Sequence, residues 1–243
     1  MTKGIVLSLY DFTGEALKPW AEAGYTCYAF DIQHPVEGHT TDFWGLGNIH
    51  YRHADLHDQA TLNAIQSEFC DKPVVFGMAF PVCTDMAVSG AAHFKRKAER
   101  DPEFQTKAVN YAKWCGELFD ALGVPYFIEN PVSVLSSKWR LPDHRFQPYE
   151  YGGYIPDNQA EHPRWPEYIA AKDAYPKKTC LWTGGGFVMP WTDPVLPEEG
   201  HSRQHKKLGG KSQRTKDIRS ATPRGFAIAI YEANRLPNIQ EYI

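Results

Sequence analysis

The feature that most constrains the fold is a regular alternation of short apolar runs with stretches of helical spacing. The apolar runs have the composition of strands and cover residues 5–10, 26–30, 74–80 and 125–128. Helical patterns lie between them at residues 15–23, 60–69 and 102–122. Strands and helices that alternate at this spacing form parallel β-α-β units. We therefore expect an α/β protein with a mostly parallel, Rossmann-like sheet and helices on both faces.

The C-terminal third of the chain has a different character. The 243 residues suffice for one substantial domain with its own core. Beyond Tyr151 the chain is rich in Pro, Gly and aromatic residues, which predicts loops and short strands until a last helix at residues 223–234. We expect one core with a small C-terminal elaboration, divided into a core over 1–182, a short basic loop segment over 183–221 and a closing helix over 222–243.

Composition excludes several classes of protein. Hydrophobic residues make up 42% and charged residues 23%, which is ordinary for a globular chain and excludes wholesale disorder. No apolar run approaches the ~20 residues of a membrane span, and the N-terminus leads into a strand without a cleavable signal. The five cysteines contain no CxxC pair, which favours a reducing compartment. We expect a cytoplasmic protein without membrane contact.

The charge is unevenly distributed. The formal net charge is −3, which argues against a protein covered in basic charge for binding polyanions. Residues 203–224 nevertheless contain eight Lys or Arg residues, Lys211 among them, against one acid, Asp217. This segment therefore predicts a local basic face.

Ligands of open α/β sheets bind outside the carboxyl ends of the strands, so those ends hold the candidate site residues. Gly14 closes the turn after the first strand, and Asp31 follows the second strand about 20 residues later, where a ribose-binding acid lies in nucleotide-binding folds. Cys83 follows the strongest strand in a polar loop, where helix N-terminal amides would lower its pKa and activate the thiolate. The remaining cysteines are interpreted as small buried apolar residues: Cys27, Cys70, Cys115 and Cys180.

Glu129, Asn130 and Pro131 follow a further buried strand. A Glu at the end of such a strand is costly to bury unless it is paired, or protonated so that it can donate a hydrogen bond. A functional role is therefore more plausible for Glu129 than for a surface carboxylate.

Taken in chain order, these elements resemble the DNA (cytosine-5) methyltransferase family. The resemblance covers the turn 10–14, the acids Asp31 and Asp55, the Pro-x-Cys loop 81–83, the Glu-Asn-Pro element 129–131, the basic-aromatic run 177–182 and the Thr-Pro-x-Gly-Phe sequence 222–226. The Cys-Thr-x-x-Ala-Val-Ser-Gly loop at 83–90 is similar to that of compact, phage-type members.

The resemblance implies transfer of a methyl group from S-adenosylmethionine to carbon 5 of cytosine in DNA, within a bacterial or phage-infected cell. Cys83 would add to carbon 6, Glu129 would neutralise charge at ring nitrogen 3, and Asn130 would complete the catalytic set. A base within a duplex would have to be flipped out. DNA is the partner that the resemblance implies, and no obligate protein partner is inferred.

The resemblance also assigns binding residues. For the cofactor it implies contacts from Tyr10, Asp11, Phe12, Thr13, Gly14, Asp31, Asp55, Phe80 and Pro81. For the substrate it implies contacts from Ser89, Pro131, Lys177, Lys178, Arg214 and Arg219. No metal site is expected, because His50, His53 and His57 share helical spacing but lack a matching Cys or second carboxylate partner.

Two alternatives remain open. Only about 40 residues separate Trp182 from Thr222, where a large target-recognition domain would lie, so we expect low or short sequence specificity. The same chemistry on free nucleotide or RNA is one alternative. The other is a noncatalytic nucleic-acid-binding relative, because Val82 stands where the family has Pro before the nucleophile.

Overall fold

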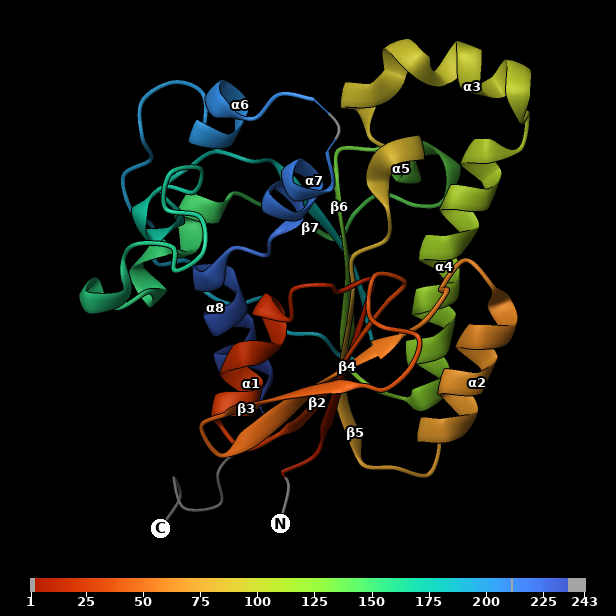
Figure 1. Ribbon diagram of the computed structural model, residues 1–243, viewed down its shortest axis with the longest axis horizontal. Coiled ribbons are helices and arrows are strands. Elements are labelled where there is room, and N and C mark those ends of the chain that lie inside the picture. The colour runs from red at the N-terminus through yellow and green to blue at the C-terminus, as the bar shows by residue number, and fades with distance from the viewer. Residues whose placement is uncertain (1–2, 211, 236–243) are drawn as a thin grey trace.

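The computed structural model describes residues 3–210 and 212–235, and its strands form one mixed sheet (Figure 1). The strands are β1 (Ile5–Leu9), β2 (Thr26–Asp31), β3 (Thr40–Trp44), β4 (Gly47–His53), β5 (Val74–Ala79), β6 (Tyr126–Pro131), β7 (His144–Phe146) and β8 (Thr179–Gly184). The α-helices are α1 (Lys18–Glu22), α2 (Gln59–Phe69), α3 (Phe94–Arg100), α4 (Phe104–Leu122), α5 (Leu135–Lys138), α6 (Arg203–Lys207), α7 (Gln213–Ser220) and α8 (Arg224–Asn234).

The sheet has the order β3-β4-β2-β1-β5-β6-β8-β7. Strands β4, β2, β1, β5 and β6 are parallel, whereas β3 pairs antiparallel with β4, and β8 pairs antiparallel with both β6 and β7. Without the hairpin strand β3, the parallel strands follow the Rossmann order 3-2-1-4-5. The predicted α/β class with a mostly parallel sheet is confirmed. The strand order reverses between β1 and β5, which is where such sheets bind ligands.

Helices cover both faces of the sheet, as the alternation of strands and helices predicts. Figure 1 shows α2 and α4 on one side of the strands, and α1 and α8 on the other. Phe69 of α2 and Phe119 of α4 are buried against Leu7 and Ile128 on the first face. Trp20 of α1 and Phe226 of α8 are buried with Val6 and Phe127 on the second. Both helical layers are therefore fixed by apolar packing on the same strands.

The C-terminal segment is more ordered than its composition suggests. We expected no helix between Tyr151 and the last helix at residues 223–234. This expectation is wrong, because α6 and α7 both lie within 183–221. The Ser202 and Ser212 side chains cap these helices by accepting bonds from His205 N and Thr215 N. A third apolar cluster joins this segment to the preceding loops: Trp165, Ile169, Ala170, Tyr175, Ile218 and Ala221.

Two further elements differ from the sequence expectation. The His-rich stretch before Asp58 contains the hairpin of β3 and β4, and the residues after the Cys83 loop contain α3. Lys211 of the basic segment, and the part of the closing helix assigned to 236–243, lie outside the described residues. Within the described part of the chain, none of the helices has the length and apolar character required to cross a bilayer.

Buried His162 makes the third cluster sensitive to acid. Its Nδ1 accepts bonds from Arg164 N (3.2 Å) and Trp165 N (3.1 Å). Burial, together with nearby Arg224, lowers the pKa of His162 to about 4 from 6.5. Between pH 6.5 and about pH 4 the unfolded chain therefore binds a proton at His162 that the folded state does not bind. The free energy of unfolding falls as the pH drops through this range.

We expect His162→Asn to lose less stability on acidification than the wild type, because Asn keeps the acceptor and does not titrate. The difference should amount to about 2 kcal/mol at pH 5, measured by urea unfolding at pH 7 and pH 5. The pKa of Asp173 is raised to about 6, so this residue changes stability with pH in the opposite direction. Its contribution is the same in both proteins and cancels when the variant is compared with the wild type. Parallel loss of stability in both proteins would contradict this assignment.

Candidate active site

The ends of β5 and β6 bring the candidate catalytic residues together. These neighbouring parallel strands pair Ala79 with Ile128, so the residues that follow emerge at the same edge of the sheet. Cys83 begins a single 3-10 turn shortly after β5, and Glu129 lies near the end of β6. Asn130 Nδ2 donates to Pro81 O at 2.9 Å, which ties the Cys83 loop to β6. Cys83, Glu129 and Asn130 therefore lie at the same edge of the sheet, and their joint catalytic role stays a prediction.

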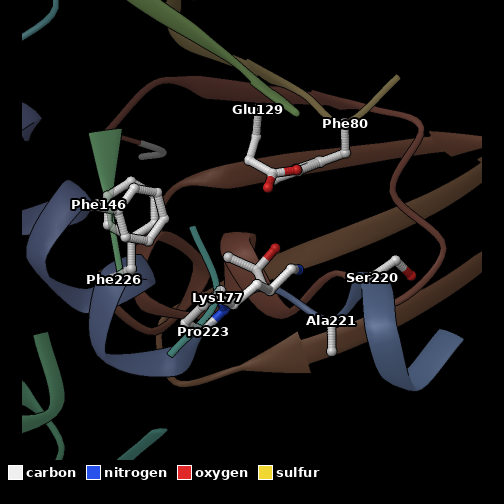
Figure 2. Close-up of a pocket in the computed structure, with 9 residues that line it drawn as sticks. Phe80, Glu129, Phe146, Lys177, Ser220, Ala221, Pro223 and Phe226 are labelled. Carbon is white, nitrogen blue, oxygen red and sulfur yellow. The ribbon is translucent and has the colours of Figure 1, made fainter. Parts of the chain in front are cut away.

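A small pocket opens beside Glu129 (Figure 2). Its empty volume is about 240 Å³, and its walls are Phe80, Glu129, Phe146, Lys177, Ser220, Ala221, Thr222, Pro223 and Phe226. Figure 2 shows the Glu129 side chain entering the pocket from β6, with Lys177 and Pro223 across from it. This empty volume includes open solvent at the mouth, so the pocket is a small recess with room for part of a ligand at most.

The wall opposite Glu129 is held by contacts within the C-terminal segment. Lys177 Nζ donates to Arg219 O at 2.9 Å, which anchors the end of α7 beside the pocket. The rings of Phe146 and Phe226 stack with centroids 3.9 Å apart and form an apolar side wall. A planar group that enters the pocket thus meets aromatic faces on one side and polar groups on two others.

The environment of Glu129 favours its neutral form. Burial raises the pKa of this carboxyl, and the positive charge of Lys177 opposes the shift only in part. A carboxyl group that stays protonated near neutral pH can donate a hydrogen bond or a proton to a ring nitrogen. Glu129 is thus suited to stabilise negative charge that develops on a heterocyclic base.

The pKa of the Cys83 thiol is shifted in the direction opposite to the expected one. The loop was expected to lower its pKa, but burial raises it, the charge of Glu129 raises it further, and Lys177 opposes both. The expected activation of the thiol by its loop is therefore wrong, because desolvation outweighs the nearby donors. Cys83 ionises most readily when Glu129 is neutral and Lys177 is charged.

Removing the charge of Lys177 should raise the pKa of Cys83. We expect Lys177→Gln to move the pH profile of alkylation of Cys83 by iodoacetamide to higher pH. Lys178→Gln is the matched control, because Lys178 is the exposed neighbour and does not contribute to the shift of Cys83. Mass spectrometry of the peptide that contains Cys83 measures the rate at each pH. Equal profiles for the two variants would contradict the electrostatic coupling of Lys177 to Cys83.

The turn after β1 is built around Asp11. Its Oδ1 accepts from Gly14 N (2.7 Å) and Thr13 N (3.1 Å), and its Oδ2 accepts from Ser8 Oγ (2.7 Å). Asp11 therefore shapes the turn with both oxygens. Gly14 has φ +66°, and a Cβ there would lie 2.7 Å from the hydroxyl oxygen of Tyr51, so the turn requires glycine.

Three predicted cofactor residues meet beside this turn. Tyr10 donates to Leu56 O at 2.7 Å, and burial together with Asp55 and Asp31 raises the pKa of its phenol. Asp31 is buried at the end of β2, where its Oδ1 accepts from Gln33 N at 2.8 Å. Asp55 is exposed and lies in the loop that follows β4. Two carboxylates near one tyrosine, at the carboxyl edge of β2 and β4, can accept bonds from hydroxyl and amino groups of a nucleoside.

The remaining predicted residues lie outside the pocket, with the exception of Phe80 and Lys177. Phe12 stacks on His34 beside the turn, with centroids 5.7 Å apart. Ser89 and Lys178 are exposed, and Pro131 is half-buried at the end of β6. Arg214 lies over the Tyr168 ring, and Arg219 donates to Leu208 O at 2.8 Å.

The expectation for the other cysteines is partly confirmed, and the spacing inferred for the histidines is wrong. Cys27, Cys115 and Cys180 are buried as expected, but Cys70 is exposed, because it lies at the C-cap of α2, beyond the last buried residue of that helix. His50 and His53 lie on β4, so the helical spacing inferred for them does not apply. The described residues contain no group of three or more His, Cys, Asp or Glu that could hold a metal ion.

Two contributors to the site are not among the predicted residues. Lys97 of α3 donates to Thr84 O (2.9 Å) and pairs with Asp85 Oδ1 (2.5 Å), which clamps the turn that contains Cys83. Phe146, on the three-residue strand β7, forms a pocket wall. Lys97 stood in a visibly basic stretch after the Cys83 loop, whereas Phe146 carried no local signal.

The class of protein follows from the fold and the site alone. No protein-family model matches the chain, and no curated protein matches it. The fold and the site define an α/β protein with a Rossmann-like strand order and a Cys-Glu pair at the carboxyl edge of its sheet.

Proposed function

We propose that this protein is an S-adenosylmethionine-dependent methyltransferase that acts on carbon 5 of cytosine in DNA. The observation that carries the proposal is the position of Cys83 and a half-buried Glu129, whose pKa is raised by burial, at the ends of adjacent parallel strands. A nucleophile next to a protonated acid is what attack on an electron-rich pyrimidine requires. The sequence resemblance to DNA (cytosine-5) methyltransferases supports the same assignment.

The reaction divides into an addition and an elimination. The Cys83 thiolate forms a bond to carbon 6, while ring nitrogen 3 takes the Glu129 proton, so that carbon 5 becomes nucleophilic. When bound, S-adenosylmethionine would supply the electrophilic methyl group of its sulfonium, whose sulfur would keep the electron pair of the broken bond and leave as a neutral thioether. After carbon 5 is methylated, its proton leaves to water, the sulfur–carbon 6 bond breaks, and the proton on nitrogen 3 returns to Glu129. Asn130 holds Pro81, and so the Cys83 loop, in place throughout.

The residues at the switch point fit such a cofactor. The turn needs glycine at position 14, because φ is positive there and the Tyr51 ring lies against it, so Phe12 and Thr13 are the half-exposed residues of the turn. Asp31 and Asp55 offer acceptors for ribose hydroxyls and an adenine amino group, and Tyr10 lies close to both. These residues would hold the nucleoside part, whereas Phe80 links this region to the Glu129 pocket.

Trapping of a covalent adduct tests the mechanism. DNA in which every cytosine is 5-fluorocytosine carries no proton at carbon 5, so elimination cannot follow methyl transfer. We expect a denaturant-stable complex between this DNA and the protein in the presence of S-adenosylmethionine, with the crosslink at Cys83. Transfer to ordinary DNA without any trapped adduct would contradict the role of Cys83. The same assay with fluorinated RNA or free nucleotide tests the alternative substrates.

A further inference from the structure

Helix α3 presents cationic side chains that the fold itself does not use. Residues 94–100 contain four Lys or Arg residues and one Glu. Lys95, Arg96 and Arg100 are exposed and make no ion pair with any residue that the structure describes. By contrast, Lys97 donates hydrogen bonds to Thr84 O and to the carboxylate of Asp85. Three unpaired cations on one short helix form a local positive surface, although the net charge of the protein is negative.

This helix is attached to the loop of the candidate nucleophile. Lys97 links α3 to the turn that contains Cys83, and the Phe94 and Phe104 rings pack at 5.8 Å to anchor it on α4. Between Cys83 and α3, the Val88 N–H donates to Val132 O at 3.0 Å, which joins the loop to the segment after β6. The positive surface is thus held in a fixed relation to Cys83 and Glu129.

A second basic region lies on the other side of the same edge. Figure 1 shows α3 at the end of the molecule where α6 and α7 also lie, with the end of β6 between them. Lys206 and Lys216 of α6 and α7 are exposed there. A chain of phosphates that passes over the carboxyl ends of the strands would therefore meet cations on both sides.

We propose that Lys95, Arg96 and Arg100 of α3 bind backbone phosphates of a DNA duplex whose target cytosine enters the Glu129 pocket. This inference rests on the proposed function and specifies where the DNA backbone contacts the protein. A free nucleotide carries its phosphates on the sugar of the reacting base, so it does not need a separate cationic helix beyond the nucleophile loop. Contacts to phosphate carry no sequence information, in agreement with low sequence specificity.

The salt dependence of binding tests the proposal. Each phosphate contact contributes about 0.9 to the slope of log affinity against log salt concentration for duplex DNA. For the double variant Lys95→Ala/Arg96→Ala we expect a slope smaller in magnitude by about 1.8, and at least about tenfold weaker duplex binding at 0.1 M salt. The control is Lys3→Ala/Lys72→Ala, which removes the same charge from the opposite edge of the sheet and should leave the slope unchanged. Fluorescence anisotropy with a mixed-sequence duplex measures both quantities.

The possible results separate this inference from the proposed function. If the wild type binds and methylates the duplex but the α3 variant keeps the wild-type slope, α3 does not contact phosphate and the inference fails. Equal losses in both double variants would also overturn it, because the effect would then be one of net charge. If the wild type methylates free nucleotide and binds no duplex, the DNA assignment itself fails.

Discussion

Replacing Cys83 by serine should abolish methyl transfer to DNA while leaving DNA binding in place. Serine keeps the size of the side chain, but its hydroxyl ionises far less readily than a thiol, so addition to carbon 6 is lost. Removal of an enzyme nucleophile typically costs on the order of 10³-fold or more in kcat. Incorporation of a labelled methyl group into DNA measures the loss, and anisotropy with the same duplex measures binding.

Cys70→Ser is the matched control for this variant. Cys70 is an exposed free thiol after α2, and the Cys83→Ser and Cys70→Ser variants differ only in the site of the exchange. Wild-type activity of Cys70→Ser with an inactive Cys83→Ser supports the nucleophile. Activity that survived in Cys83→Ser would remove Cys83 from the mechanism. Binding without transfer in the wild type as well would favour the noncatalytic alternative that Val82 suggests.

Glu129→Gln should have the second largest effect. The amide keeps the shape of the side chain and still donates a hydrogen bond, but it has no proton to give to ring nitrogen 3. Loss of a positioned general acid costs about 10²–10⁴-fold in kcat. The wild-type rate should fall as Glu129 ionises at high pH. The residual rate of the variant should not show this fall. A variant that retained the wild-type rate and profile would contradict the role of the carboxyl.

The same variant has an expected signature in stability. The raised pKa means that folded Glu129 holds a proton that the unfolded chain releases, so stability falls as the pH rises from about 4.5 through the folded pKa. Glutamine does not titrate, so this part of the decline should be absent from Glu129→Gln. Urea unfolding at pH 5 and pH 8 measures the two slopes. An equal or steeper decline in the variant would show that the pKa of Glu129 is not raised in the folded protein.

The sequence predicted those parts of the fold that local patterns determine. Residues 74–80 and 125–128 are apolar runs bounded by polar loops, so strands β5 and β6, and with them the approximate place of Cys83 and Glu129, followed directly. The hairpin of β3 and β4 was missed because its burial is sparse: of its residues only Ile49 is buried. A half-exposed hairpin lacks the apolar alternation on which strand prediction depends.

Features that depend on distant contacts could not be predicted. Helix α7 buries only Thr215 and Ile218, and Ile218 packs against residues from another part of the chain, such as Trp165. The pKa of Cys83 was predicted in the wrong direction because burial by the assembled site, not the helix amides of the loop, dominates it. Likewise, Lys97 reaches Thr84 across 13 positions, which no local pattern reveals.

The central claim, that Cys83 and Glu129 methylate cytosine in DNA at carbon 5, is tested most directly by nucleoside mass spectrometry. Unmodified double- and single-stranded DNA would be incubated with the protein and S-adenosylmethionine, digested to nucleosides and analysed for methylated products. The account predicts 5-methylcytosine from DNA with the wild type, and none with Cys83→Ser. Methylation confined to RNA or free nucleotide, or no methylated nucleoside from any substrate, would contradict it.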